Sequence, residues 1–189
     1  MKRFLPFLIF AIVLGSARLL GSMTPESLGN LQPLGALFFC GMACFGLRGI
    51  ILPALVWFLT YPLTSLQQGY GWSFQMLVPL LGFVAMVLLA RRFRKAAPGK
   101  IFLGSLAGAC AFYLITNTLS WAMEPQYAKS LPGLIQALTV GLPQYATPTW
   151  VFFRNSLLSQ ATFSAIFLMA TQTMVARLPK TARATVPAA

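Results

Sequence analysis

Long apolar segments separated by short polar or basic connections dominate the hydrophobic pattern of this chain. Six of them have the composition of membrane spans, at about residues 4–20, 34–47, 50–63, 74–90, 101–119 and 150–176. A helix needs about 20 predominantly apolar residues to cross the hydrocarbon core of a bilayer. The pattern therefore predicts an all-α membrane protein, in which residues 1–189 form a single domain built as a six-transmembrane-helix bundle.

The first apolar segment has two interpretations. Residues 15–17 (Gly-Ser-Ala) resemble the small-residue cleavage site of a secretory signal peptide, and two basic residues precede the apolar stretch. The apolar residues continue past that site to Leu20. We therefore expect a retained helix rather than a cleaved leader.

The second and third segments are each short for a complete span. Only Arg48 and Gly49 separate them, so a single long helix is an alternative. Gly46, Gly49 and Pro53 favour a break, because glycine and proline interrupt helices. We expect a tight helical pair.

The polar connection before the last segment contains one amphipathic stretch. Apolar residues recur there at three- and four-residue spacing, which is typical of a helix with one apolar face. Ser130 can cap this helix, Pro132 suits its first turn, and Gly141 and Pro143 end it. We expect a short interfacial helix at about residues 131–142, which serves as a structural lid or as a gate for a substrate.

Composition supports a membrane location. Of the 189 residues, 58% are hydrophobic and only 8% are charged, and the mean hydropathy is +0.75. A soluble domain carries about 25% charged residues. This chain has too few polar side chains to cover a water-soluble globule.

Basic residues greatly outnumber acidic ones, 14 against 2, for a net charge of +12. They lie between apolar segments, where they set topology and meet anionic lipid headgroups, so we expect no nucleic-acid partner. We predict a bacterial inner (cytoplasmic) membrane protein with both termini, including a basic tail at residues 177–189, in the cytoplasm. The basic residues that this topology places inside are Lys2, Arg3, Arg48, Arg91, Arg92, Arg94, Lys95, Lys100, Arg177, Lys180 and Arg183.

Polar side chains in or beside the apolar segments are the candidates for function, because placing them in a membrane is costly. They converge on the outer ends of the spans, which suggests an outward-facing polar pocket for a small neutral or anionic molecule. We expect Arg154 to supply charge and the amides to supply hydrogen bonds. The candidate substrate-binding residues are Arg18, Asn30, Gln32, Gln75, Asn117, Arg154 and Asn155.

Some of these outer residues also have interpretations that involve no ligand. Arg18 can extend toward the lipid headgroups, as arginine does readily near helix ends. Trp72, Trp121 and Trp150 suit an aromatic belt at the membrane interface as well as they suit stacking on a ligand.

Residues for catalysis are scarce. The chain has no histidine, and it carries no zinc, nucleotide-binding or nucleophile motif. Cys40 and Cys44 are one helical turn apart and could share a ligand, but with Cys110 they fit small buried residues better. We therefore expect no enzyme, no cofactor and no metal, and active uptake would draw its energy from an ion gradient or another subunit.

Small residues recur four positions apart in two of the predicted helices. The pairs are Ala11 with Gly15, Ala17 with Gly21, and Gly104 with Gly108. Such spacing permits close packing of helices, within the chain or against a partner membrane protein.

Several stretches of the sequence resemble a known family. Residues 30–43 resemble the opening segment of DUF6580, a family of bacterial membrane proteins of unknown function, and residues 117–121, 131–143 and 152–158 resemble its C-terminal half. The Phe-Phe-Arg-Asn motif that begins at Phe152 is fairly specific. The resemblance implies a size, span number and outer pocket similar to those of the S components of energy-coupling-factor transporters.

The chain departs from the family pattern at two acidic positions. Family members place an aspartate shortly after the third span and another after the Arg-Asn-Ser/Thr-Leu-Leu run. Here Tyr61-Pro62 and Gln160 stand at about those places. The role of those acids is therefore not carried over to this chain.

These observations favour a membrane protein that binds a small molecule and takes part in its uptake. The cytoplasmic basic cluster at residues 91–95 would then meet anionic lipid or a coupling module. The alternative is a structural or assembly subunit of a larger membrane complex.

Overall fold

The computed structural model describes residues 5–24, 29–67, 77–145 and 147–176. Within those ranges the chain forms seven helices and no strand, so the all-α prediction is confirmed. The helices are α1 (Leu5–Met23), α3 (Leu34–Phe45), α4 (Leu47–Gln67), α5 (Leu77–Arg91), α6 (Pro98–Met123), α7 (Leu131–Leu138) and α8 (Thr149–Ala176).

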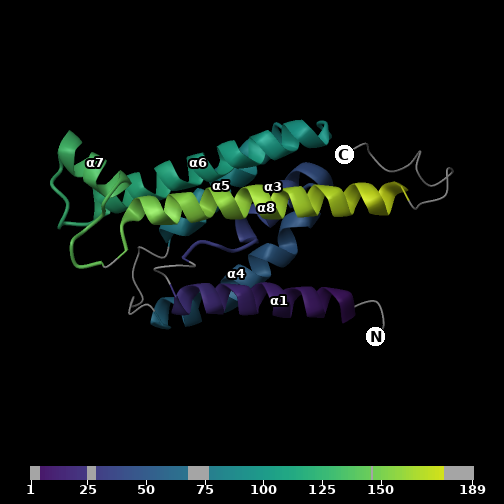
Figure 1. Ribbon diagram of the computed structural model, residues 1–189, viewed down its shortest axis with the longest axis horizontal. Coiled ribbons are helices and arrows are strands. Elements are labelled where there is room, and N and C mark those ends of the chain that lie inside the picture. The colour runs from purple at the N-terminus through teal and green to yellow at the C-terminus, as the bar shows by residue number, and fades with distance from the viewer. Residues whose placement is uncertain (1–4, 25–28, 68–76, 146, 177–189) are drawn as a thin grey trace.

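Most helices follow the long axis of the molecule, and α4 crosses it obliquely (Figure 1). The short helix α7 lies at one end, which we call the α7 end. The first residues of α1, the last residues of α8 and the turns α3–α4 and α5–α6 lie at the other end (Figure 1). We call this the basic end, for the exposed cations in or beside those turns, which are Arg48, Arg91, Arg92, Arg94, Lys95 and Lys100.

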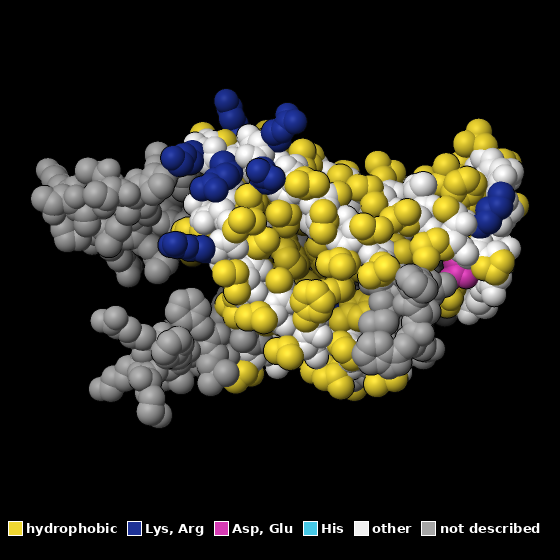
Figure 2. Space-filling view, turned by 180° about the vertical axis from the view of Figure 1, so that it is seen from behind, with side chains coloured by type: hydrophobic (Ala, Val, Ile, Leu, Met, Phe, Trp, Pro, Cys, Tyr) yellow, Lys and Arg dark blue, Asp and Glu magenta, His cyan; other side chains and the backbone are white. Residues whose placement is uncertain are grey.

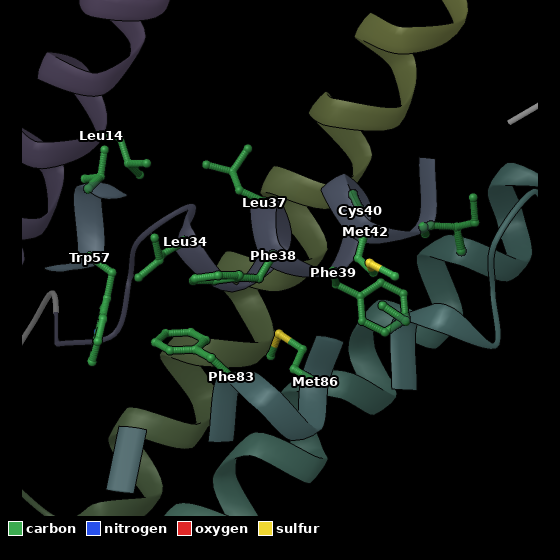
Figure 3. Packing of buried hydrophobic residues seen from close by; sticks show 14 of the residues in the cluster. Leu14, Leu34, Leu37, Phe38, Phe39, Cys40, Met42, Trp57, Phe83 and Met86 are labelled. Atoms are coloured by element: carbon green, nitrogen blue, oxygen red, sulfur yellow. The ribbon is translucent and has the colours of Figure 1, made fainter. Parts of the chain in front are cut away.

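Helix α3 is the central element of the bundle. It contacts α4, α5, α6 and α8, whereas α1 packs mainly on α4. Phe38 of α3 stacks on Phe83 of α5 with ring centroids 4.6 Å apart, and Met86 lies beside them (Figure 3). Phe39 is fully buried in the same cluster. Its apolar residues explain why α3 occupies the core.

The break between α3 and α4 lies at Gly46, whose φ of +70° is one that side chains other than glycine rarely adopt. The two helices then run back along each other at very close range. A Cβ on Gly41 would lie 2.5 Å from the carbonyl oxygen of Gly49. Two glycines are needed here because neither backbone leaves room for a side chain.

Large apolar side chains cover the outside of the bundle between its two ends (Figure 2). Leu59 of α4 is 73% exposed and Leu103 of α6 is 65% exposed. By length and composition, two helices among the described residues can cross a membrane, α4 over Leu47–Leu66 and α6 over Pro98–Met123. Helices α3 and α5 are apolar but have only 12 and 15 residues.

Helix α7 ends at Leu138, four residues earlier than the amphipathic pattern suggests. Beyond it the chain turns, because the backbone N–H of Gly141 (φ +76°) donates to the carbonyl of Gln136. The N–H of Trp150 then donates to the carbonyl of Thr139 at 2.8 Å. The apolar residues after Leu138 therefore belong to a turn that joins α7 to the start of α8.

The capping residues of α7 lie where the sequence suggests. The side chain of Ser130 accepts a hydrogen bond from the N–H of Gly133, and Pro132 lies in the first turn. Gly133 and Ala137 face the bundle, whereas Leu131 and Ile135 are 69% and 52% exposed. Leu131 and Ile135 thus point away from the protein, whereas Leu134 and Leu138 are half-buried.

Candidate functional site

A cavity of about 400 Å³ lies in the α7 half of the bundle, and we call it the wide cavity. Its lining comes from α1, α4, α5, α6 and α8, from the loop before α3 and from the connection that carries α7. Small-molecule sites in proteins typically have volumes of about 300–1,000 Å³. The wide cavity is therefore large enough for a small organic molecule.

Aromatic side chains form much of this lining. Trp57 of α4 lies 6.1 Å from Phe83 of α5, and Phe83 lies 4.9 Å from Phe112 of α6, measured between ring centroids. The other aromatic residues of the lining are Tyr61, Tyr113, Tyr127, Tyr145 and Phe152. Rings of this kind provide flat apolar surfaces that suit the body of a planar ligand.

Arg18 is the single basic residue in the cavity lining, and it is only 8% exposed. Its Nε donates to the hydroxyl of Thr60 at 2.7 Å, and one terminal nitrogen donates to the hydroxyl of Thr64 at 3.4 Å. Its other terminal nitrogen donates to Oε1 of Gln32 at 3.1 Å. Among the described residues its partners are therefore neutral oxygen atoms, with no carboxylate.

The loop of residues 29–33, which we call the inner loop, directly precedes α3 and contributes to the lining of both cavities; Gly29 is buried, whereas Asn30 and Leu31 are exposed. Asn30 has φ +63°, a left-handed conformation that asparagine tolerates better than most residues. Nδ2 of Asn155 donates to the carbonyl of Gly29 at 2.9 Å, and the hydroxyl of Ser159 donates to the carbonyl of Gln32. Two α8 side chains one helical turn apart thus satisfy buried loop carbonyls.

A second, narrow cavity of about 50 Å³ adjoins the inner loop. It shares five residues with the lining of the wide cavity: Asn30, Gln32, Phe83, Phe112 and Ser156. Gln160 of α8 lines it and is only 3% exposed, and its Nε2 has no hydrogen-bonding partner among the described residues. A buried amide donor without a partner is rare in folded proteins.

The first turn of α3 also meets the narrow cavity. Gly35 lines it, and a Cβ there would lie 2.7 Å from Oε1 of Gln160. Pro33 precedes the helix, and no side chain caps its first turn. The N-terminus of a helix attracts hydrogen-bond acceptors and anions.

The structure brings several of the predicted site residues together. Arg18, Asn30, Gln32 and Asn117 all line the wide cavity. The side chain of Asn117 is held within α6, because its Nδ2 donates to the carbonyl of Tyr113, one turn earlier, at 2.8 Å. Gln75 lies outside the described residues.

Arg154 and Asn155 occupy different positions from the other candidates. Arg154 is exposed and lies over the ring of Trp150, 5.4 Å from its centroid, and it donates to Oδ1 of Asn155 at 3.1 Å and 3.2 Å. Asn155 is buried and holds the inner loop rather than lining either cavity. The cation inside the cavity is therefore Arg18.

The sequence analysis did not single out Thr60, Thr64, Ser156 and Ser159, which contact Arg18 or line the cavities. Thr60 and Thr64 are four residues apart, so they share a helix face. Such spacing of hydroxyl residues in an apolar segment is a weak signal that could have indicated a polar face. Nothing in the local sequence indicates that this face meets Arg18.

The connection between α6 and α8 closes the lining at the α7 end. The hydroxyl of Tyr113 donates to the carbonyl of Leu138, and the indole N–H of Trp121 donates to the carbonyl of Ala128 at 2.8 Å. Tyr127 lines the cavity there, and burial, together with nearby Tyr145, raises the pKa of its phenol. Tyr127 is therefore neutral at neutral pH.

Within the described parts of the chain, no group of three or more Cys, Asp or Glu side chains is placed to hold a metal ion. The polar groups that line the wide cavity are the guanidinium of Arg18, the carboxylate of Glu124, and amides and hydroxyls from several elements. This set can bind a ligand through hydrogen bonds and through the positive charge of Arg18.

Comparisons with known proteins point to one family. Neither the curated proteins nor the solved structures contain a match to this chain. A family model, described as a family of unknown function (DUF6580), matches residues 1–182. Because the match covers nearly the whole chain, this protein belongs to the DUF6580 family.

Proposed function

We propose that this protein is a multi-pass membrane protein that binds a small molecule in the wide cavity and takes part in its uptake. The observation that carries the proposal is the cavity itself, about 400 Å³ in volume and lined by both aromatic and polar side chains. Such a mixture of apolar surface and a few convergent polar groups is typical of ligand sites. The proposed role is binding rather than catalysis.

The distribution of apolar and charged residues supports the membrane part of the proposal. Soluble monomers rarely expose apolar patches beyond a few hundred Å². Here exposed leucine, isoleucine and phenylalanine side chains cover the middle of the molecule, and the cations gather at one end (Figure 2). We place the basic end in the cytoplasm by the positive-inside rule.

We propose six crossings, made by α1, α3, α4, α5, α6 and α8. The short helix α3 would cross together with the inner loop, whose carbonyls are satisfied by Asn155 and Ser159. Non-helical backbone is tolerated at membrane depth where it is buried in protein or lines a cavity. Both termini then lie in the cytoplasm of a bacterial cell, and the α7 end faces outward.

We propose that this arrangement is similar to that of the S components of energy-coupling-factor transporters. The similarity is one of size, span number and an outward pocket, and fold alone does not establish function. Under this proposal the energy for uptake comes from an ion gradient or from another subunit. The basic end would meet anionic lipid headgroups or such a subunit.

Mass spectrometry of the purified protein tests the proposal. We expect a small molecule to co-purify with the wild-type protein and to be lost from Ser156→Phe, since Ser156 lines both cavities. Leu158→Phe is the matched control, because Leu158 lies on the same helix and is 55% exposed. If no small molecule co-purifies and partner proteins instead remain bound in fixed ratio, the protein is an assembly subunit.

Labelling of introduced cysteines tests the topology. In intact cells a cysteine at Lys129 should react with a membrane-impermeant thiol reagent, whereas one at Arg92 should react only after lysis. Both positions are exposed, so access through the membrane decides the result. Labelling of the cysteine at Arg92 from outside would overturn the proposed orientation.

A further inference from the structure

Arg18 is hydrogen-bonded to neutral groups, and no described carboxylate is among its partners. Three of the five N–H groups of its guanidinium donate to Thr60, Thr64 and Gln32, which leaves two without a partner among the described residues. Glu124 is the single acidic side chain in the described ranges and also lines the wide cavity, but the hydrogen bonds of Arg18 go to Thr60, Thr64 and Gln32. A guanidinium that is 8% exposed is thus held by neutral groups alone.

A buried cation of this kind favours an anion beside it. Removing a charge from water costs several kcal/mol unless an opposite charge and hydrogen bonds compensate. Arginine binds carboxylates especially well, because its planar fork matches both oxygens. Because Arg18 lines the wide cavity, a ligand in that cavity is the natural source of the missing negative charge.

The narrow cavity has the same preference for electron-rich groups. The Nε2 of Gln160 is a buried donor without a partner among the described residues, and its Oε1 lies beside Gly35 in the uncapped first turn of α3. Nε2 and the first turn of α3 both offer N–H donors, and none of the described residues that line this cavity is acidic. An acceptor atom of the ligand, such as a carbonyl or hydroxyl oxygen, would satisfy Gln160.

Two aromatic rings are shared by the two cavities, beside the polar residues Asn30, Gln32 and Ser156. Phe83 and Phe112 line both cavities, and Trp57 continues the aromatic surface toward Arg18. Rings and other planar groups stack well on such surfaces. The cavity therefore combines a cation, an aromatic surface and a neutral donor.

We propose that the ligand is an organic anion, in which a carboxylate binds Arg18 and a planar apolar body packs between Trp57, Phe83 and Phe112. This inference rests on the proposed function, because it assigns a chemical class to the molecule bound in the same cavity. The neutral donor of Gln160 selects ligands that carry an acceptor at the end opposite the carboxylate.

The test compares three probes of nearly equal shape and different charge: phenylacetate, phenylacetamide and 2-phenylethylammonium. Binding to the full-length protein in detergent is followed by the fluorescence of Trp57, with Trp57→Phe as the control for signals from the other tryptophans. We expect phenylacetate to bind at least about 10-fold more tightly than phenylacetamide, because hydrogen bonds between charged groups are the stronger ones. The ammonium probe should bind most weakly.

Substitutions of Arg18 test whether this residue causes the preference for phenylacetate. Arg18→Gln should remove the preference for phenylacetate over phenylacetamide, and Arg18→Lys should retain a reduced preference. Arg92→Gln is the matched control, since Arg92 is exposed at the opposite end of the molecule. If Arg18→Gln does not fold, Arg18→Lys and the comparison of probes on the wild-type protein still decide the question.

The outcomes separate this inference from the proposed function. Equal or tighter binding of the amide or ammonium probe, or a co-purifying molecule without a negative charge, overturns the organic anion but leaves a binding protein. Absence of any bound probe and of any co-purifying small molecule overturns both. A co-purifying organic acid supports both, whereas anionic phospholipid as the sole occupant overturns the soluble organic anion.

Discussion

The two ends of the bundle are built in opposite ways. At the basic end glycines bring elements together: Gly41 meets Gly49, and a Cβ on Gly104 would lie 2.7 Å from the ring of Phe93. At the α7 end the helices stand apart around a cavity of about 400 Å³ lined by Arg18, amides and aromatic rings. At the basic end, glycines allow the elements to pack closely. At the α7 end, large and polar side chains line an open cavity.

The difference teaches how one short helix creates a site. Helix α3 has 12 residues and packs most of its length into the core of the bundle. Before the first residue of α3, toward the α7 end, the chain forms the inner loop, and this loop fills less space than a further turn of helix with its side chains. The cavities therefore lie next to the N-terminus of α3, and its first turn faces the narrow cavity.

Filling the glycine contact at the closed end should have the largest effect. In Gly41→Leu the new side chain meets the backbone of Gly49, which cannot move aside as a side chain can. We expect a loss of about 3 kcal/mol or more in the free energy of unfolding. Thermal unfolding in detergent, followed by far-UV circular dichroism, measures it.

Gly99→Ala is the control for that experiment, because nothing lies within 4 Å of a Cβ at Gly99. It should change stability by less than about 1 kcal/mol. Equal stability of Gly41→Leu and Gly99→Ala would show that the α3–α4 contact does not close the basic end.

At the open end, Asn155→Ala should cause the next largest loss. The substitution leaves the buried carbonyl of Gly29 without its donor, which costs about 1–3 kcal/mol. Ligand affinity should fall as well, because the inner loop loses an anchor. Asn117→Ala is the comparison: the carbonyl that Asn117 contacts lies within helix α6, so stability should change much less.

Gln160→Leu should affect stability and binding in opposite directions. Replacing a buried donor that has no partner with an apolar side chain of similar size should stabilise the empty protein by about 1 kcal/mol. The same change should weaken binding of the co-purifying molecule by about 10-fold. Gln172→Leu, at an exposed position of the same helix, should do neither, and a loss of stability in Gln160→Leu would contradict the assignment of Nε2.

The smallest effect is expected for Arg154→Gln. Arg154 is exposed, so its charge is well solvated and its hydrogen bonds to Asn155 contribute little, about 0–1 kcal/mol. Probe affinity should stay within about twofold of wild type. A loss of affinity as large as that of Arg18→Gln would move the binding charge from the cavity to the surface.

The helices could be predicted from the sequence because each is an uninterrupted apolar segment. Residues 101–119 and 150–176 lie within or nearly coincide with α6 and α8, and Gly46 marks the predicted break between α3 and α4. The end of α7 could not be predicted from apolar spacing, as residues 138–142 show. Apolar spacing there continues, but the turn held by Gln136 ends the helix.

The candidate site was predictable only in part. Arg18, Gln32 and Asn117 stand out because polar groups in apolar segments are unusual, and they line the wide cavity. From the sequence alone, Arg154 is as good a candidate as Arg18, because the pattern does not show which side of α8 faces the cavity. The contacts of Asn155 and Ser159 with the inner loop span 126 and 127 positions, and no local pattern reports a contact over that distance.

Those two contacts also set an order of assembly during synthesis. The inner loop is made early, and the α8 side chains that satisfy its carbonyls are made more than 120 residues later. Until the ribosome has passed Ser159, the carbonyls of Gly29 and Gln32 lack their final donors. The inner end of the cavity is therefore completed last, and a nascent chain that stops before α8 has helices but no finished binding site.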